Sequence, residues 1–248
     1  MGFGPRQPVI ELFLDDEHRN RASYWLPELV FRGHTDEGQF WITPGVKWMS
    51  DGEAWRFEHL NEGGLLFVAG EVRSAADGWH TALTVQNRSD KSWPNVAAAA
   101  CLLLSSAIDY ADSNRSRTYY RTEGRFQTFG QSSFDGGQEV YRMSRVKGVN
   151  LIERSQRHMA KWGFTRTPSD DGVIAVMHAS THRILTVTWE SVNHLQANAK
   201  PAFACIHANP GFGSIAPGKS STVKGSVLIT DGNLETAWAK ALRSVGGG

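Results

Sequence analysis

Two histidines and a glutamate that lie close together in the sequence have the residue types needed for acid–base or metal chemistry. Glu190 directly follows a strand-like run that ends at Trp189, and His194 and His207 lie in the polar sequence beyond it. An imidazole near a carboxylate can act as a general base or a metal ligand, because its pKa lies near neutral pH. Glu190, His194 and His207 are therefore the candidate catalytic residues. The alternative is that both imidazoles hydrogen-bond backbone groups and only fasten a loop to a sheet.

Two regular strands enclose these residues. The runs 184–189 and 222–229 both alternate apolar and polar side chains, which is typical of strands with one buried face. The sequence between them is polar and rich in turn residues, so we expect a loop that carries ligand-type side chains on a rigid scaffold. Asn198 and Asn209 lie in this loop and are candidate substrate-binding residues. His207 alternates with Cys205, so these two side chains are expected on the same strand face.

A second histidine pair, His178 and His182, has a spacing that would suggest zinc if the pair lay on a helix. Here the pair lies between two predicted strands, residues 173–177 and 184–189. Across a turn the same spacing brings the rings together only by accident. Solvated turn histidines are the favoured interpretation.

The composition limits the partners of the protein. Its 248 residues include 26 basic and 25 acidic residues, for a net charge of +1, so no global field favours nucleic acid or an anionic membrane. No apolar run has the length of a membrane span and no secretory signal is visible, so we expect a cytoplasmic protein. The two cysteines, Cys101 and Cys205, lie in apolar strand-like runs and are expected to be free buried thiols.

Turn signals recur about every ten residues, which is the spacing of a sandwich or barrel. The predicted fold class is all-β: a large antiparallel β-sandwich with one C-terminal α-helix. Residues 233–242 have helical spacing, with Leu234, Ala237, Trp238 and Leu242 on one face. Pro27 indicates an edge or a bulge in its strand. The nine tryptophans are expected to fill the core or to stack on sugars.

Two motifs carry a resemblance to known architectures. The run 79–96 resembles a hairpin of immunoglobulin-like and related β-sandwich domains, and the run 215–223 resembles a turn before a late strand in the same domains. We expect a single domain over 1–248, in which about 106–172 either enlarges the sheets or forms a lobe over one end. Enlarged sheets are favoured, because so long an insertion does not stay structureless. Such a sandwich is similar to the supersandwich of galactose-mutarotase-like proteins. The run 189–218 also resembles a segment of uncharacterised bacterial β-sandwich proteins that accompany carbohydrate metabolism.

The resemblance to the mutarotase-like fold implies a His and a Glu acting on a sugar ring over a concave sheet face lined by aromatic and arginine side chains. The implied lining residues are Trp48, Trp189, Arg121 and Arg145. The resulting hypothesis is a carbohydrate-active enzyme, an isomerase, lyase or hydrolase, with a small-molecule or oligosaccharide ligand. The alternative is a non-catalytic carbohydrate-binding or structural assembly protein. A divalent metal ion is the cofactor that the histidines admit, and homo-oligomerisation stays open.

Overall fold

The apolar residues alternate along the strands, and this alternation builds two sheets around one core. The computed structural model describes residues 8–32, 39–42, 46–149, 163–200 and 203–246. In β6 (Leu66–Ala75) and β7 (Gly78–Asn87) every second side chain is buried. Such a pattern buries one face of a strand and leaves the other toward solvent.

The first sheet has nine described strands in the order β1–β2–β8–β17–β16–β12–β13–β11, with β3 paired to β2. Its strands are β1 (Val9–Phe13), β2 (Arg21–Phe31), β3 (Gln39–Trp41), β8 (Trp93–Leu103), β11 (Phe134–Asp135), β12 (Tyr141–Arg145), β13 (Gly163–Thr165), β16 (Val192–Lys200) and β17 (Phe203–Ile215). Neighbouring strands pair antiparallel, apart from β12 and β13, which run parallel. The register of β2 shifts between Trp25 and Leu29, so the bulge predicted at Pro27 is confirmed.

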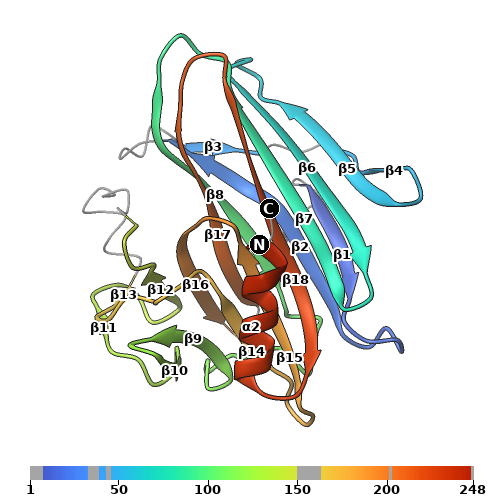
Figure 1. Ribbon diagram of the computed structural model, residues 1–248, viewed down its shortest axis with the longest axis vertical. Helices are drawn as coiled ribbons and strands as arrows, with labels where there is room; N and C mark the ends of the chain where they lie inside the picture. Colours follow the sequence, from blue (N-terminus) through green and yellow to red (C-terminus); the bar gives the residue numbers. More distant parts are fainter. Residues whose placement is uncertain (1–7, 33–38, 43–45, 150–162, 201–202, 247–248) are drawn as a thin grey trace.

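The second sheet also has nine described strands, in the order β10–β9–β14–β15–β18–β7–β6–β5–β4. The strands not yet bounded are β4 (Met49–Ser50), β5 (Ala54–Leu60), β9 (Thr118–Thr122), β10 (Arg125–Thr128), β14 (Ile174–Met177), β15 (Arg183–Trp189) and β18 (Ser220–Asp231). Side chains from both sheets meet in one core, which includes Trp93, Trp189 and Phe57. The all-β sandwich is confirmed (Figure 1).

The segment 106–172 adds strands to the edges of both sheets. Its β9 and β10 extend the second sheet, and its β11, β12 and β13 extend the first. The division into a single domain over 1–248 stays a prediction.

The two motifs that resemble immunoglobulin-like turns carry the chain from one sheet to the other. β7 lies in the second sheet and β8 in the first, so the run 79–96 forms an arch and not a hairpin. The run 215–223 likewise joins β17 to β18. Buried Asn87 ties both arches together, because its Nδ2 donates to the carbonyls of Lys91 (2.7 Å) and Ile215 (2.9 Å).

The C-terminal helix, α2 (Leu234–Val245), covers the outer face of the second sheet over β15 and β18 (Figure 1). Asn233 caps its N-terminus by accepting a hydrogen bond from the amide of Thr236. Ala237, Trp238 and Ala241 are buried, whereas Leu242 is 38% exposed. The predicted helix is therefore confirmed, but the residue that its last turns bury is Ala241 and not Leu242. Among the described residues, no helix has both the length and the apolar character required to span a bilayer.

Candidate functional site

The residues 192–200 and 203–215 form two long paired strands, where the sequence analysis expected a loop with an extended run only at 203–207. In β16, Leu195 and Ala197 point into the core between the sheets, and in β17 Ile206 and Ala208 do the same. The polar residues between them therefore point to the outer face of the first sheet. The alternation was readable in the sequence, but the many Asn and Gln side chains suggested a loop.

The outer side chains of β16 and β17 form three cross-strand pairs, His194 with Asn209, Gln196 with His207 and Asn198 with Cys205. Cys101 of the neighbouring strand β8 completes the group, which we call the polar face. Its seven members are His194, Gln196, Asn198, Cys205, His207, Asn209 and Cys101, and each is at most 7% exposed. Four of the residues selected from the sequence, His194, His207, Asn198 and Asn209, thus lie together.

The tautomer of His194 follows from its hydrogen bonds. Asn209 Oδ1 accepts the amide proton of Ala100 (3.2 Å), so its Nδ2 faces His194 and donates to Nε2 (2.7 Å). Nδ1 of His194 lies 2.9 Å from Oδ1 of Asn193 and must be the protonated nitrogen. His194 is therefore held as a neutral imidazole with its lone pair on Nε2.

A thiol cluster occupies the other part of the polar face. The Cys205 sulfur lies 3.3 Å from Nε2 of His207 and accepts a hydrogen bond from Nδ2 of Asn198 (3.4 Å). The hydrogen bond with the Cys101 thiol lowers the pKa of Cys205, against the effect of burial, and His207 and Asn198 act in the same direction as Cys101. Burial raises the pKa of Cys101. The thiols are free and buried, as the sequence predicts.

His207 and the Cys205 thiolate stabilise each other's charged forms. Burial acts to lower the pKa of His207, but the negative charge and hydrogen bond of Cys205 outweigh it and raise the pKa above its usual value. Glu28 adds to this effect on His207 and also raises the pKa of Cys101. Glu28 lies in the bulge of β2 beside β8. Sequence analysis missed this carboxylate, although Pro27 had marked the bulge that places it.

Two buried polar atoms of the polar face have no hydrogen-bond partner within the described ranges. They are Oδ1 of Asn198 and Nδ1 of His207. Burying such an atom without a partner costs free energy, and native proteins satisfy most of them. Both atoms therefore have an unused capacity for one hydrogen bond.

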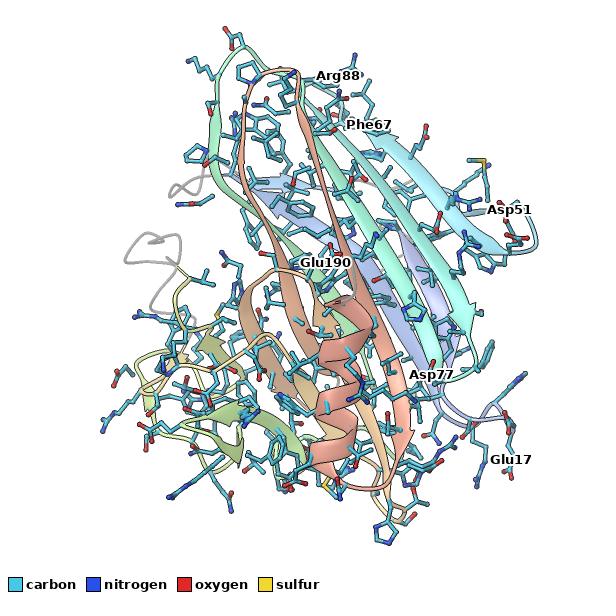
Figure 2. The ribbon with its side chains drawn as sticks, viewed as in Figure 1. Glu17, Asp51, Phe67, Asp77, Arg88 and Glu190 are labelled. Carbon is cyan, nitrogen blue, oxygen red and sulfur yellow. The ribbon has the colours of Figure 1, made fainter. Side chains whose placement is uncertain are left out.

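Two further residues selected from the sequence belong to the second sheet. Trp189, at the end of β15, is 3% exposed and packs in the core between the sheets. Glu190, labelled in Figure 2, is exposed, and its carboxylate accepts a hydrogen bond from the amide of Lys224 in β18 (2.9 Å). The structure therefore does not place Trp189 and Glu190 on the polar face.

The remaining selected residues are spread over three regions. Trp48 packs edge-on against Phe57 of the second sheet, with ring centroids 4.8 Å apart. Arg121 lies on β9 of the second sheet. Arg145 of β12 pairs with His194 across the strands, and its guanidinium lies 5.1 Å from the ring centroid of Phe164. Of the three, only Arg145 adjoins the polar face.

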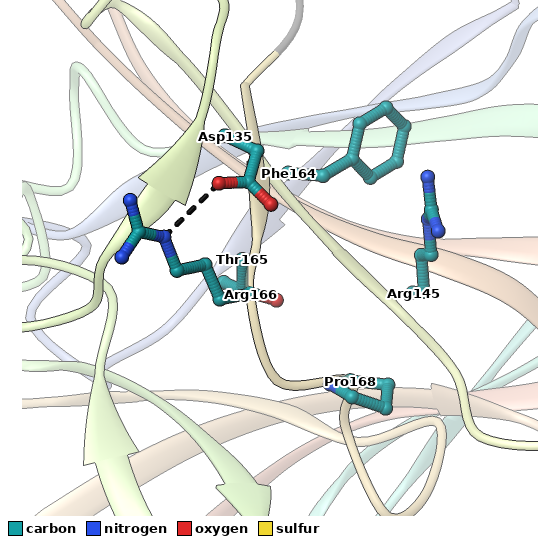
Figure 3. Close-up of a pocket in the computed structure, with 6 residues that line it drawn as sticks. All are labelled: Asp135, Arg145, Phe164, Thr165, Arg166 and Pro168. Atoms are coloured by element: carbon teal, nitrogen blue, oxygen red, sulfur yellow. Dashed lines mark hydrogen bonds and ion pairs between the residues drawn. The ribbon is translucent and has the colours of Figure 1, made fainter.

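A small cavity of about 180 Å³ lies beside Arg145 (Figure 3). It is lined by Asp135, Arg145, Phe164, Thr165, Arg166 and Pro168. Asp135 and Arg166 form an ion pair across it, with 3.0 Å between carboxylate oxygen and Nε. Arg145, which pairs with His194, is the one residue that links this cavity to the polar face.

The second histidine pair lies in a turn. Nδ1 of His178 accepts the amides of Ser180 (3.1 Å) and Thr181 (3.2 Å), and its Nε2 lies 3.5 Å from the carboxylate of Asp109. His182 is exposed. The bonds of His178 are those of a residue that shapes its own turn.

Comparison with protein-family models and with curated proteins finds no match. Solved structures similar to this chain include α-N-acetylgalactosaminidase NagBb from Bifidobacterium bifidum, at 11% identity and a TM-score of 0.49, over 98% of this chain and 38% of that one. A galactose mutarotase-like protein from Lactobacillus casei has 10% identity and a TM-score of 0.47, with 89% of each chain covered. A putative aldose 1-epimerase from Escherichia coli K12 has 12% identity and a TM-score of 0.46, over 92% of this chain and 81% of that one. The resemblance to galactose-mutarotase-like proteins expected from the sequence is thus found at low identity, and it bears on neither substrate nor mechanism.

Proposed function

We propose that the polar face is the substrate site of a carbohydrate-active enzyme, an isomerase, lyase or hydrolase. The observation that carries the proposal is the pair of unpartnered buried atoms, Asn198 Oδ1 and His207 Nδ1, on a face where two imidazoles lie on neighbouring strands. Ten other buried side-chain atoms of the described residues also lack a partner, so what distinguishes these two is that they lie together beside two imidazoles on one sheet face. A ligand rich in hydroxyl groups would satisfy both, because each hydroxyl can donate and accept.

The surroundings of the polar face favour an uncharged polar ligand with an apolar side. The amides of Gln196, Asn198 and Asn209 carry no net charge, so they suit hydroxyl groups better than phosphates. Phe31 stacks beside His194, with ring centroids 6.3 Å apart, and offers an aromatic surface to the C–H face of a sugar ring. Ligand sites commonly combine such apolar walls with a few fixed polar groups.

The two histidines are suited to opposite roles. The raised pKa of His207 favours its protonated form, which can give a proton to a ring or leaving-group oxygen. His194 keeps an unprotonated Nε2, which can accept a proton once a substrate hydroxyl replaces the Asn209 amide. Environments that hold two groups in opposite protonation states are typical of acid–base pairs. In this proposal Glu28 takes the carboxylate role that the sequence analysis gave to Glu190, because its negative charge helps to raise the pKa of His207.

A second candidate function is a non-catalytic carbohydrate-binding or assembly protein. The burial of the polar face favours this candidate, because His194 and His207 are both only 2% exposed. In that case the imidazoles hold β16 and β17 in register. Homo-oligomerisation stays a prediction, which native mass spectrometry tests.

One set of variants separates the two candidates. Ligands would be found by saturation-transfer NMR with mono- and oligosaccharides, and turnover of the hits would be followed in the same samples. For an enzyme, His194→Gln and His207→Gln lower the turnover of bound saccharide by at least about 100-fold, and His207→Gln also weakens saccharide binding, because Nδ1 of His207 is proposed to bond the ligand. The matched control is His182→Gln, because His182 is exposed in the turn, and this variant should change neither turnover nor saccharide binding. Binding without turnover supports the second candidate, and the absence of any saccharide binding refutes the enzyme and leaves only the assembly role.

A further inference from the structure

Three ligand-type atoms converge at the thiol end of the polar face. The sulfurs of Cys101 and Cys205 and one ring nitrogen of His207 all lie within 4.8 Å of one another. All three side chains are at most 5% exposed. No other group of this kind is found in the described part of the chain.

Sheet geometry fixes these atoms in place. Cys205 and His207 are two residues apart on β17, so both point to the outer face. The neighbouring pair of Ile206 with Leu102 brings Cys101 of β8 beside His207. Groups on paired strands are held more rigidly than groups on loops, so they lose little conformational entropy when they bind a ligand.

The spacing suits a tetrahedral metal ion. A zinc ion with Zn–S bonds of about 2.3 Å and a Zn–N bond of about 2.05 Å places sulfur and nitrogen about 3.6 Å apart and the two sulfurs about 3.8 Å apart. The distance from Cys205 sulfur to His207 Nε2 is 3.3 Å, so small side-chain movements are enough to admit the ion. A disulfide would need the sulfurs at about 2.05 Å, and it would leave His207 without a role.

From this geometry we infer that Cys101, Cys205 and His207 form a site for a zinc-like cation. Two thiolates and an imidazole are ligands for zinc and other soft or borderline metals, whereas magnesium and calcium require a shell of oxygen atoms. Three protein ligands leave one position of a tetrahedron open, which is the arrangement of catalytic zinc and not of structural zinc. This inference goes beyond the proposed function, since the metal would bind whether or not the ligand is a sugar, and a zinc-bound His207 would act as a ligand in place of the proton donor proposed above.

The surroundings supply the outer contacts that metal ligands have in proteins. Asn198 donates to the Cys205 sulfur (3.4 Å), which is how amide groups hold thiolate ligands. Binding through Nε2 leaves Nδ1 of His207, the unpartnered buried nitrogen, to donate to a bound ligand. The other histidines considered for metal binding are engaged elsewhere: His194 with Asn193 and Asn209, and His178 within its turn.

The experiment is cobalt and zinc binding to the full chain under reducing conditions, without any saccharide. Cobalt titration should give one equivalent of tetrahedral absorption bands with sulfur-to-cobalt charge transfer, and zinc should displace the cobalt. Zinc affinity follows from competition with a chromogenic chelator. Cys101→Ser, Cys205→Ser and His207→Gln should each weaken zinc binding by more than about 100-fold, because removal of an outer contact alone costs up to about that much.

His194→Gln is the matched control, since this histidine lies on the same face outside the cluster, and its zinc affinity should equal that of the wild type. Absence of the charge-transfer band in the wild-type protein overturns the inference, and this result does not depend on whether any variant folds. Zinc binding that survives both cysteine substitutions overturns it as well. Zinc binding without saccharide turnover would leave the metal site standing and refute the enzyme proposal, so the two can fail separately.

Discussion

Replacement of Asn209 by alanine should destabilise the protein by about 3 kcal/mol, because this side chain satisfies two buried groups at once. Its Oδ1 accepts the amide of Ala100 and its Nδ2 donates to Nε2 of His194. Each group left unsatisfied inside a protein costs about 1–3 kcal/mol. Asn209 is 1% exposed, so water does not compensate for the loss without rearrangement of the sheet.

Urea denaturation followed by tryptophan fluorescence measures this free energy of unfolding. Asn114→Ala is the matched control, because the exposed Asn114 also accepts an amide, that of Ser116 (3.1 Å), and its loss should cost less than about 1 kcal/mol. Nitrogen chemical shifts of His194 should show the Nδ1-protonated tautomer in the wild type and a mixture of tautomers in the variant. Equal unfolding energies for the Asn209 and Asn114 variants would refute the assignment of Asn209 as the residue that holds His194.

Three further predictions concern the scaffold. Asn87→Ala removes one bond within its own arch, to Lys91, and one bond to the other arch, at Ile215, and should lower the free energy of unfolding measured in urea by about 2–4 kcal/mol; a cost below about 1 kcal/mol contradicts its role. Burial raises the pKa of Asp171, against the hydrogen bond from Trp238. The native state therefore holds the carboxyl proton of Asp171 more tightly than the unfolded chain does. The stabilisation of the native state by this proton is complete below pH 3.8 and is lost as pH rises through the native pKa of Asp171. Asp171→Asn should make the free energy of unfolding fall less steeply between about pH 4 and about pH 7. An unchanged slope contradicts the raised pKa of Asp171. Trp238→Ala should lower the free energy of unfolding by about 3–5 kcal/mol and release α2, because the ring of Trp238 is buried and its centroid lies 5.1 Å from that of Phe126. Retention of the full helical circular dichroism with wild-type stability would contradict this.

The strands and the helix were predictable because their signals are local. Alternation in β6 and β7, and the spacing of Ala237 and Trp238 in α2, depend only on near neighbours in the sequence. The arches were misread as hairpin-like because a polar turn such as the one at Asn87 looks the same in both. Whether the next strand returns to the same sheet depends on its pairing partners, and β8 pairs with β2 and β17, which are distant in the sequence.

The candidate site was predictable in part. His194 and His207 were identifiable as ligand-type residues, and the pairing of β16 with β17 then brought them together. Cys101 joins this face from β8, and the charge of Glu28 in β2 acts on His207, and no local pattern reports such long-range effects. Glu190 is close to His194 in the sequence, but the chain changes sheets between them, so proximity along the chain was misleading.

The alternation over residues 194–198 of β16 and 205–209 of β17 limits how this protein can change over evolutionary time. Insertion or deletion of a single residue within either run would exchange its two faces. Leu195 and Ala197 would then occupy the site, and His194 and Gln196 would enter the core. Descendants of this chain can therefore alter the site by substitution, while differences in length are expected outside these two runs, for example at the register shifts beside Val192 and Gly213.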